Sequence, residues 1–185
     1  MKSELYEYKV RIPRERVGVL IGKGGKMKER MEKELDVKIR VKGNEVTIRS
    51  EDSIDGWIAK NVVTAIGRGF SPEIALWLKD ENFTLNIIDI KEWARSKKKL
   101  IRLRGRLIGS EGKVKEKIEK LCNVKLSIYG KTISVIGNAY NVELASKAIE
   151  KLLNGSKHST IFRMLENQRK SLKERELACQ RLLRK

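Results

Sequence analysis

Histidine, cysteine and long apolar runs are scarce in this chain of 185 residues, and each absence excludes a class of protein. Histidine occurs once, at His158, so the sequence offers no histidine cluster for a metal and no histidine base beside a nucleophile. The two cysteines, Cys122 and Cys179, lie far apart and fit buried or free thiols in a reducing compartment. We therefore expect no metal, no cofactor and no disulfide framework.

Apolar runs are too short for a membrane protein, because none approaches the roughly 20 residues that a bilayer span needs. The first residues, Met1–Glu4, lack the apolar core of a signal peptide. We expect a cytoplasmic protein that does not bind a membrane.

Acidic residues are the minority charge, with 24 Asp and Glu against 42 Lys and Arg, a formal net charge of +18 and a pI of about 10.0. The plain interpretation is a basic surface that keeps the protein soluble. A surplus this large in so short a chain instead favours a polyanionic partner, with nucleic acid ahead of a membrane surface.

A glycine-rich loop near the start of the chain is suited to binding a phosphodiester backbone. Residues 20–26 read LIGKGGK, and Gly22 and Gly25 bracket two residues. Glycine allows positive φ and a close approach to another chain. The helix expected to begin at Lys26 directs its free N–H groups and the positive end of its dipole at the loop, where lysine side chains add full charges.

This loop occurs twice, which argues against a simple helix-linking turn. Leu20–Ser50 aligns with Leu107–Gly137 without a gap. The alignment superposes the bracketing glycines and also their basic flank: Gly22 on Gly109, Gly25 on Gly112, Lys26 on Lys113 and Lys28 on Lys115. A structural turn has little reason to keep a basic flank in both copies, so we infer an internal duplication.

Hydrophobic periodicity predicts the same element order around each loop. The first copy has an expected strand at 5–12, helices at 14–21 and 26–35, strands at 37–41 and 45–49, and a helix to about 66 with Asp52 or Ser53 as its cap. The second has a strand at 84–90, helices at 97–108 and 113–122, strands at 123–129 and 132–136, and a helix at 141–153. Strand, helix, glycine loop, helix, hairpin and closing helix is the order of a eukaryotic-type KH RNA-binding module.

We therefore predict an α+β protein with two tandem type I KH domains, each a three-stranded sheet covered by helices, and a C-terminal helix. The expected boundaries are 4–70 for the first domain, 71–83 for a connecting helix opened by Ser71 and Pro72, 84–155 for the second domain, and 156–185 for a basic helical tail. The connection is apolar, so we expect one packed body. The tail either packs on the second domain or orders on a partner. Near the junction, three tryptophans are expected to pack between the domains: Trp57, Trp77 and Trp93.

In KH modules the glycine loop clamps the backbone of about four unpaired nucleotides while the adjacent sheet edge reads the bases. In the first domain, the residues expected to hold the RNA backbone are Ile21, Gly22, Lys23, Gly24, Gly25, Lys26 and Lys28. Ile39 and Arg40 are expected to lie on the central strand and to face the bases. The apolar groove selects single strands, because paired bases cannot present their faces or Watson–Crick edges to it.

In the second domain, the residues expected to hold the RNA backbone are Arg104, Arg106, Ile108, Gly109, Ser110, Gly112, Lys113 and Lys115. Leu126 and Ser127 are expected to face the bases. Glu111 departs from the pattern, because an acidic residue between the two glycines repels phosphate. We therefore predict a weaker backbone grip in this domain.

The whole chain, from about Glu4 to Gln168, resembles the archaeal form of the small-subunit assembly factors known as partner of Nob one. The specific part is the junction, which reads GFSPEIAL at 69–76 and IDIK at 88–91, followed by RLIGSEGKVKEKIE at 106–119. Eukaryotic members usually carry Gly-Lys-Gly-Gly in the second loop and lose it in the first. This chain has Gly-Lys-Gly-Gly first and Gly-Ser-Glu-Gly second.

The resemblance implies binding to single-stranded pre-rRNA near the 3′ end of 16S-type rRNA. It also implies work beside the maturation endonuclease and the dimethyladenosine transferase, and we expect a monomer. Two other readings stay open. One is the RNA-binding subunit of a degradation complex, although such proteins usually carry a further β-barrel domain for which this chain has no room. The other is a protein-binding scaffold.

An enzyme is the main alternative class, because Lys23 in a glycine-rich loop resembles a nucleotide-binding loop. The P-loop needs four residues between its first glycine and Gly-Lys-Ser/Thr, whereas Gly18 and Gly22 are separated by three. Gly24 also stands where Ser or Thr is required. No nucleophile–base pair is visible, and carboxylates such as Glu29 and Glu32 are expected to be solvated. We therefore predict a binding protein and not an enzyme.

Overall fold

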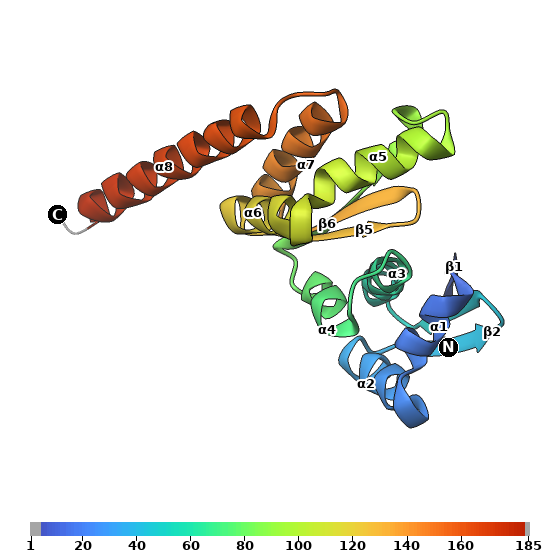
Figure 1. Cartoon of the computed structure of the whole chain (residues 1–185). Coiled ribbons are helices and arrows are strands. Elements are labelled where there is room, and N and C mark those ends of the chain that lie inside the picture. The colour runs from blue at the N-terminus through green and yellow to red at the C-terminus, as the bar shows by residue number, and fades with distance from the viewer. Residues whose placement is uncertain (1–4, 184–185) are drawn as a thin grey trace.

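The computed structural model describes residues 5–183, and the side chains of this range other than those of 172, 173 and 175–183. Two similar units follow one another, each a three-stranded antiparallel sheet with helices packed against it, and a long helix follows them (Figure 1). We call these units the first domain, from β1 to α3, and the second domain, from β4 to α7. The predicted α+β architecture of two domains and a C-terminal helix is confirmed.

The first domain is built around a sheet in the order β1-β3-β2. Alternation along β3 places Val46 and Ile48 in the core, where both are fully buried. The elements are β1 (Tyr6–Arg11), α1 (Arg14–Ile21), α2 (Lys26–Glu34), β2 (Lys38–Lys42), β3 (Glu45–Ser50) and α3 (Ser53–Gly67). The prediction that Ile39 and Arg40 lie on the central strand is wrong, because β3 takes the centre and β2 is an edge strand.

The second domain repeats this arrangement with the sheet order β4-β6-β5. Its core includes the free thiol of Cys122, and burial raises the pKa of that thiol to about 12. The elements are β4 (Phe83–Asp89), α5 (Lys97–Ile108), α6 (Lys113–Cys122), β5 (Lys125–Tyr129), β6 (Thr132–Asn138) and α7 (Ala139–Leu153). Within residues 5–183, no helix is both long enough and apolar enough to cross a bilayer.

The predicted starts of β2 and β5 are early by one and two residues, because the same turn precedes each strand. Asp36 and Asn123 occupy equivalent positions in the two copies and have positive φ of 49° and 52°. Val37 and Val124 then donate their N–H groups back to carbonyls of the preceding helix. These left-handed residues end α2 and α6, which a period-two pattern does not reveal.

Side-chain caps define the start of α3 and of the connecting helix, as predicted. The Asp52 side chain accepts hydrogen bonds from the N–H groups of Ile54 and Asp55, so Asp52 is the cap of α3. Ser71 caps α4 (Pro72–Ala75), with Pro72 at its first position. A 3₁₀ turn, η2 (Leu76–Lys79), continues α4 towards β4.

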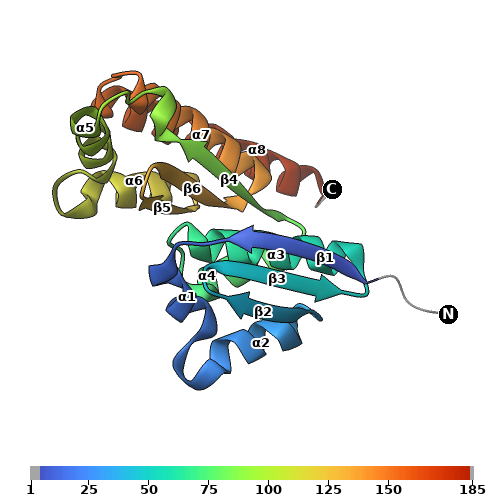
Figure 2. The ribbon, with the colours of Figure 1, turned by 90° about the vertical axis from the view of Figure 1, so that its right-hand side faces the viewer.

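The two domains pack together as one body (Figure 2). Ile136 of β6 is fully buried in the core of the first domain, and Phe83 and Leu85 of β4 pack against that core. Ser127 of β5 donates a hydrogen bond to the carbonyl of Arg68, at 2.7 Å. The predicted packing of the two domains is therefore confirmed.

A second polar contact crosses the junction near the surface. The Tyr129 hydroxyl of β5 donates to the Glu15 carboxylate of α1. This hydrogen bond lowers the pKa of the Glu15 carboxyl and raises the pKa of the Tyr129 phenol. Together with the Ser127 contact, it fixes β5 against the first domain.

Gly69 lies close against β5 at this junction. Its φ is +99°, and an added Cβ would lie 2.6 Å from Ser127 Oγ and 3.1 Å from Tyr129 Cβ. Gly69→Ala should therefore separate β5 from the first domain, whereas Gly155→Ala meets open space at a φ of +100°. We expect Gly69→Ala to lower the free energy of unfolding by about 1–3 kcal/mol more than Gly155→Ala, measured by urea denaturation. Equal losses of unfolding free energy in the two variants would show that the junction accommodates the added Cβ without strain.

The sequence left the packing of the tail open, and the structure resolves it for the first part of α8 (His158–Leu183). Ile161 and Leu165 are buried in the core of the second domain. Lys117 of α6 pairs with Glu166 at 3.1 Å and lies over the Phe162 ring. Beyond this docked part, the helix runs away from the two domains (Figure 1). Residues 184–185 of the predicted tail lie outside the described range.

The expectation that three tryptophans pack between the domains is wrong for two of them. Trp57, on α3, is 56% exposed. Trp93 packs within the second domain and donates its indole N–H to Asn154. Only Trp77 lies at the junction, edge-on to Phe83 and 41% exposed. Sequence proximity to the junction did not indicate which helix face each ring occupies.

Candidate nucleic-acid interface

The first glycine loop joins α1 to α2 through a tight turn of unusual backbone. Gly22 has φ 72° and ψ 176°, a region open essentially to glycine alone, while Gly24 and Gly25 are left-handed at φ 62° and 80°. An added Cβ at Gly22 would lie 2.6 Å from Met27 Cβ. Gly22 is therefore required for the close approach of α1 and α2, and no side chain caps the start of α2.

The second loop has the same backbone with different side chains. Gly109 has φ 72° and ψ 179°, Glu111 has φ 54° and ψ 24°, and Gly112 has φ 78°. Glu111 therefore occupies the conformation of Gly24, a left-handed position that a side chain tolerates at some cost. Its carboxylate pairs with Lys113 Nζ at 2.8 Å, and both side chains are largely exposed.

Removing the carboxylate from the second loop should strengthen RNA binding. Glu111→Gly takes away a charge that repels phosphate and frees Lys113 from its ion pair. We expect the affinity for a single-stranded RNA to rise about threefold at low salt, measured by fluorescence anisotropy. Glu111→Gln is the matched control, because it removes the charge without changing backbone freedom. An unchanged affinity in both variants would show that this loop does not contact the RNA backbone.

The loop side chains predicted to hold the RNA backbone differ in how far they reach solvent. Lys23, Gly24, Lys26, Ser110 and Lys113 are exposed, whereas Ile21, Gly22, Gly25, Lys28, Ile108, Gly109, Gly112 and Lys115 are partly buried. The exposed members cluster at the uncapped starts of α2 and α6. A phosphate there would meet main-chain N–H groups and the positive end of a helix dipole.

The side chains predicted to face the bases lie elsewhere. Ile39 and Leu126 are core residues, 1% and 4% exposed, and the Ser127 hydroxyl is bonded to the carbonyl of Arg68 at the junction. Arg40 alone among these is exposed. The alternation of side chains along a strand explains why Ile39 and Leu126 are buried. A strand at the edge of a sheet directs alternate apolar side chains into the core, and it presents main-chain groups along its outer side.

Two glutamates, Glu32 and Glu119, occupy these edges. Glu32 accepts a hydrogen bond from the N–H of Ile39 at 2.7 Å, and Glu119 accepts one from the N–H of Leu126, also at 2.7 Å. The Glu32 side chain is only 17% exposed, so the expectation that it is solvated is wrong. The internal duplication aligns Glu32 with Glu119 and could have indicated that the two glutamates share a structural role.

The edge of the first domain has a further occupant. Lys28 donates from Nζ to the carbonyl of Ile39 at 3.1 Å and lies 3.7 Å from Glu32 Oε2. Both outward main-chain groups of Ile39 are therefore bonded to α2. Among the described residues, Lys115 makes no equivalent hydrogen bond to the carbonyl of Leu126.

The two arginines expected to approach phosphate from α5 are turned towards the protein. Arg106 donates from Nε to the carbonyl of Leu152 at 3.1 Å and also bonds the carbonyl of Ser156. Its own carbonyl accepts from His158 Nε2 at 2.9 Å. Arg104 Nε is buried without a partner among the described residues. The guanidinium of Arg106 therefore ties α5 to the end of α7 and to the segment that follows it, which a basic helix pattern alone does not predict.

A groove of about 420 Å³ runs between the two domains beside β5. The first domain and α4 contribute Arg16, Ser71 and Ile74, and the second domain contributes Lys115, Glu119 and Leu126. Arg16 is held in place by hydrogen bonds to the carbonyls of Ile66 and Phe70. The edge strand of the second domain therefore faces a space that the first domain helps to enclose.

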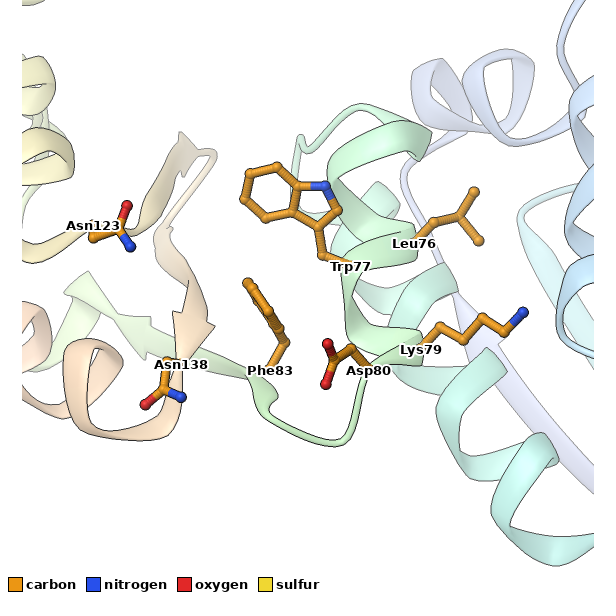
Figure 3. A pocket seen from close by; sticks show the side chains of 7 residues that line it. All are labelled: Leu76, Trp77, Lys79, Asp80, Phe83, Asn123 and Asn138. Carbon is orange, nitrogen blue, oxygen red and sulfur yellow. The ribbon is translucent and has the colours of Figure 1, made fainter. Parts of the chain in front are cut away.

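A separate pocket of about 640 Å³ lies at the junction near η2 (Figure 3). Trp77 and Phe83 form its aromatic wall, with ring centroids 5.8 Å apart and an interplanar angle of 67°. Asn123 and Asn138 line the side formed by the second domain, and Asn138 also caps α7. The pocket shares no lining residue with the glycine loops or the groove beside β5.

Across the part of the chain that the structure describes, no cluster of His, Cys, Asp and Glu is arranged to hold a metal ion.

Comparison with known families agrees with this geometry. Residues 84–170 match the eukaryotic-type KH domain (KH domain type I) that forms the second KH domain of PNO1. Residues 7–63 match the KH domain family. Both matched regions contain one glycine loop and one edge strand of the candidate interface.

Known relatives cover most of the chain. A KH domain-containing protein of Methanocaldococcus jannaschii is 43% identical over 169 residues, which is 89% of this chain and 74% of the relative. The RNA-binding protein pno-1 of Caenorhabditis elegans is 30% identical over 141 residues, 72% of this chain, and the alignment spans half of the nematode protein. The crystal structure of an a/eIF2alpha–aDim2p–rRNA complex from Pyrococcus horikoshii OT3 contains a chain with a TM-score of 0.86 and 41% identity, covering 92% of this chain and 97% of that chain.

Proposed function

Because this chain belongs to the PNO1-type family of KH-domain proteins, which includes archaeal Dim2p, we propose that it binds single-stranded rRNA near the 3′ end of 16S-type rRNA. In this role it is a small-subunit assembly factor and not an enzyme. The observation that carries the proposal is the repeated pairing of an uncapped glycine loop with a strand at the edge of the sheet in each domain.

The chemistry of these two features suits an unpaired strand. The exposed lysines and the uncapped helix starts neutralise phosphates in a sequence-independent way. An edge strand whose outward main-chain groups are not already bonded offers them to the Watson–Crick edges of bases, which are accessible only when the bases are unpaired. The net charge of +18 adds a general attraction that decreases with salt.

The rRNA target is supported by the relative crystallised with rRNA and a/eIF2alpha. By the family resemblance, the partners of this chain are the maturation endonuclease and the dimethyladenosine transferase, with the chain acting as a monomer in the cytoplasm. The exposed pocket at Trp77 and the projecting part of α8 are available to such proteins.

The first test is fluorescence anisotropy of the full chain with a short RNA that carries the 3′-terminal sequence of 16S rRNA. A scrambled RNA of the same composition is the control, and both are measured across a salt series. We expect tighter binding to the true sequence at every salt concentration.

Two results would contradict the proposal. Equal affinity for both RNAs with a steep salt dependence would mean that net charge alone does the binding. A preference for the duplex form of the same sequence would exclude the unpaired strand as ligand.

A further inference from the structure

We infer that the second KH domain reads bases through Glu119, which selects a base with an exocyclic amino group in the groove beside β5, and that the edge of the first domain is closed to bases by Lys28 and Glu32. This inference rests on the proposed binding of single-stranded RNA. It assigns base selection to one domain and to a carboxylate on a helix.

The direction of the main-chain groups on an edge strand decides which of them a base can reach. In an antiparallel pair, the N–H and C=O of one residue point to the same side of the strand. The N–H of Leu126 points to the free edge, because it reaches Glu119 and not β6. The carbonyl of Leu126 therefore also lies on the free edge, close to the carboxylate of Glu119.

This arrangement places acceptors side by side in the groove. Glu119 uses Oε1 to accept from Leu126, and among the described residues its Oε2 takes part in no ion pair or hydrogen bond. The carbonyl of Leu126 is a second acceptor. Two adjacent acceptors favour a base edge rich in donors, and every base except uracil carries an exocyclic amino group. Uracil presents carbonyl oxygens on both sides of its single N–H, and these are repelled by a carboxylate.

The first domain has an equivalent glutamate, Glu32, but the main-chain groups of its edge strand are already bonded. Its Ile39 has both outward groups bonded, the N–H to Glu32 and the carbonyl to Lys28. Lys28 also neutralises the remaining oxygen of Glu32, at 3.7 Å. A base would have to break these contacts to reach the edge, so the first domain is left with the backbone grip of its glycine loop.

The groove beside β5 has the charge and size expected of a nucleotide site. Lys115 and Arg16 supply positive charge on opposite sides, and Ile74 gives an apolar surface for a base. Its volume of about 420 Å³ lies in the range of small-molecule sites. The groove is formed by both domains, so the base read by the second domain also contacts the first.

The test compares labelled oligo(C) and oligo(U) of equal length, since cytosine and uracil share one ring and differ in the amino group. The full chain is titrated by fluorescence anisotropy near neutral pH. We expect wild type to bind oligo(C) about fivefold more tightly than oligo(U). In Glu119→Gln the amide oxygen keeps the bond to Leu126 while the amide N–H₂ replaces the free acceptor, so we expect the preference to vanish or invert.

Matched variants separate base selection from structure. Glu32→Gln makes the same change at the closed edge and is expected to leave the ratio of affinities at its wild-type value. Glu119→Ala is expected to bring the ratio towards one without inversion, and thermal unfolding of each variant reports on folding. If Glu119 only supported the strand, its variants would weaken both oligonucleotides equally and leave the ratio unchanged, which would overturn the inference.

Failure of the inference is distinguishable from failure of the proposed function. A wild-type protein that binds neither oligonucleotide nor the 16S-derived RNA would contradict single-stranded RNA binding itself. A wild-type protein that binds both with equal affinity, or a Glu32→Gln variant that shifts the ratio as much as Glu119→Gln, would contradict only the selection by Glu119.

Discussion

Replacing Lys23 and Gly24 by aspartate should reduce the affinity for single-stranded RNA at least tenfold at moderate salt. The double variant puts two carboxylates where a phosphate would meet the start of α2, and it removes an exposed lysine. Each change opposes the charge of the RNA backbone, and losing even one phosphate contact weakens binding and flattens the salt dependence. Fluorescence anisotropy across a salt series measures both effects.

The fold should survive this change, which makes the result interpretable. Gly24 lies at φ 62° and ψ 22°, and an added Cβ meets no atom within 4 Å. The equivalent residue of the second loop is Glu111, at φ 54° and ψ 24°. The molecule therefore already holds an acidic side chain in this conformation, and aspartate tolerates it better than most residues.

A matched control carries the same charge change at a different turn. Gly130→Asp/Lys131→Asp alters the turn between β5 and β6, where Gly130 has φ +58° and open space around it. We expect this control to reduce RNA affinity much less than the variant in the first glycine loop. Equal losses from the two double variants would indicate that net charge, and not the loop, controls binding.

The largest effect on stability is expected from Gly22→Ala. The φ of 72° and ψ of 176° lie in a region that costs an alanine about 1–3 kcal/mol. The new Cβ would also lie 2.6 Å from Met27 Cβ and 3.1 Å from Met27 N, so α2 must shift away from α1. We expect a loss of about 2–4 kcal/mol in the free energy of unfolding, measured by urea denaturation.

Gly24→Ala is the control for this prediction, because it places a Cβ at positive φ in open space. A loss of only about 1–2 kcal/mol is expected there. Gly109→Ala should repeat the larger loss in the second domain, since its added Cβ would lie 2.4 Å from Val114 Cγ2. Similar small losses in all three variants would mean that the loops adapt to a side chain.

The architecture could be predicted from the sequence because its signals are local and occur twice. The glycine loops, the helices that flank them and the caps at Asp52 and Ser71 depend on neighbouring residues, and the structure places them as expected. Strand order is different, because nothing local shows that β3 and not β2 lies in the centre.

The site was predictable only in part for a related reason. Residue type suggested that Arg106 meets phosphate, but its guanidinium finds carbonyls more than 40 positions away in the sequence. Charge on a helix face suggested that Glu32 is solvated, but the strand edge brings a main-chain N–H to it. The carbonyls near Arg106 and the N–H near Glu32 are brought there by tertiary packing, so composition and periodicity do not predict these contacts.

Ile136 has a consequence for how the protein responds to its ligand. A residue of the second sheet is buried in the core of the first domain, so opening either domain exposes apolar surface of both. We therefore expect the two copies to denature together as a single cooperative unit. A ligand that binds only the native state stabilises everything that must unfold with its site. RNA held at one loop accordingly protects the whole body, including the copy that it does not touch.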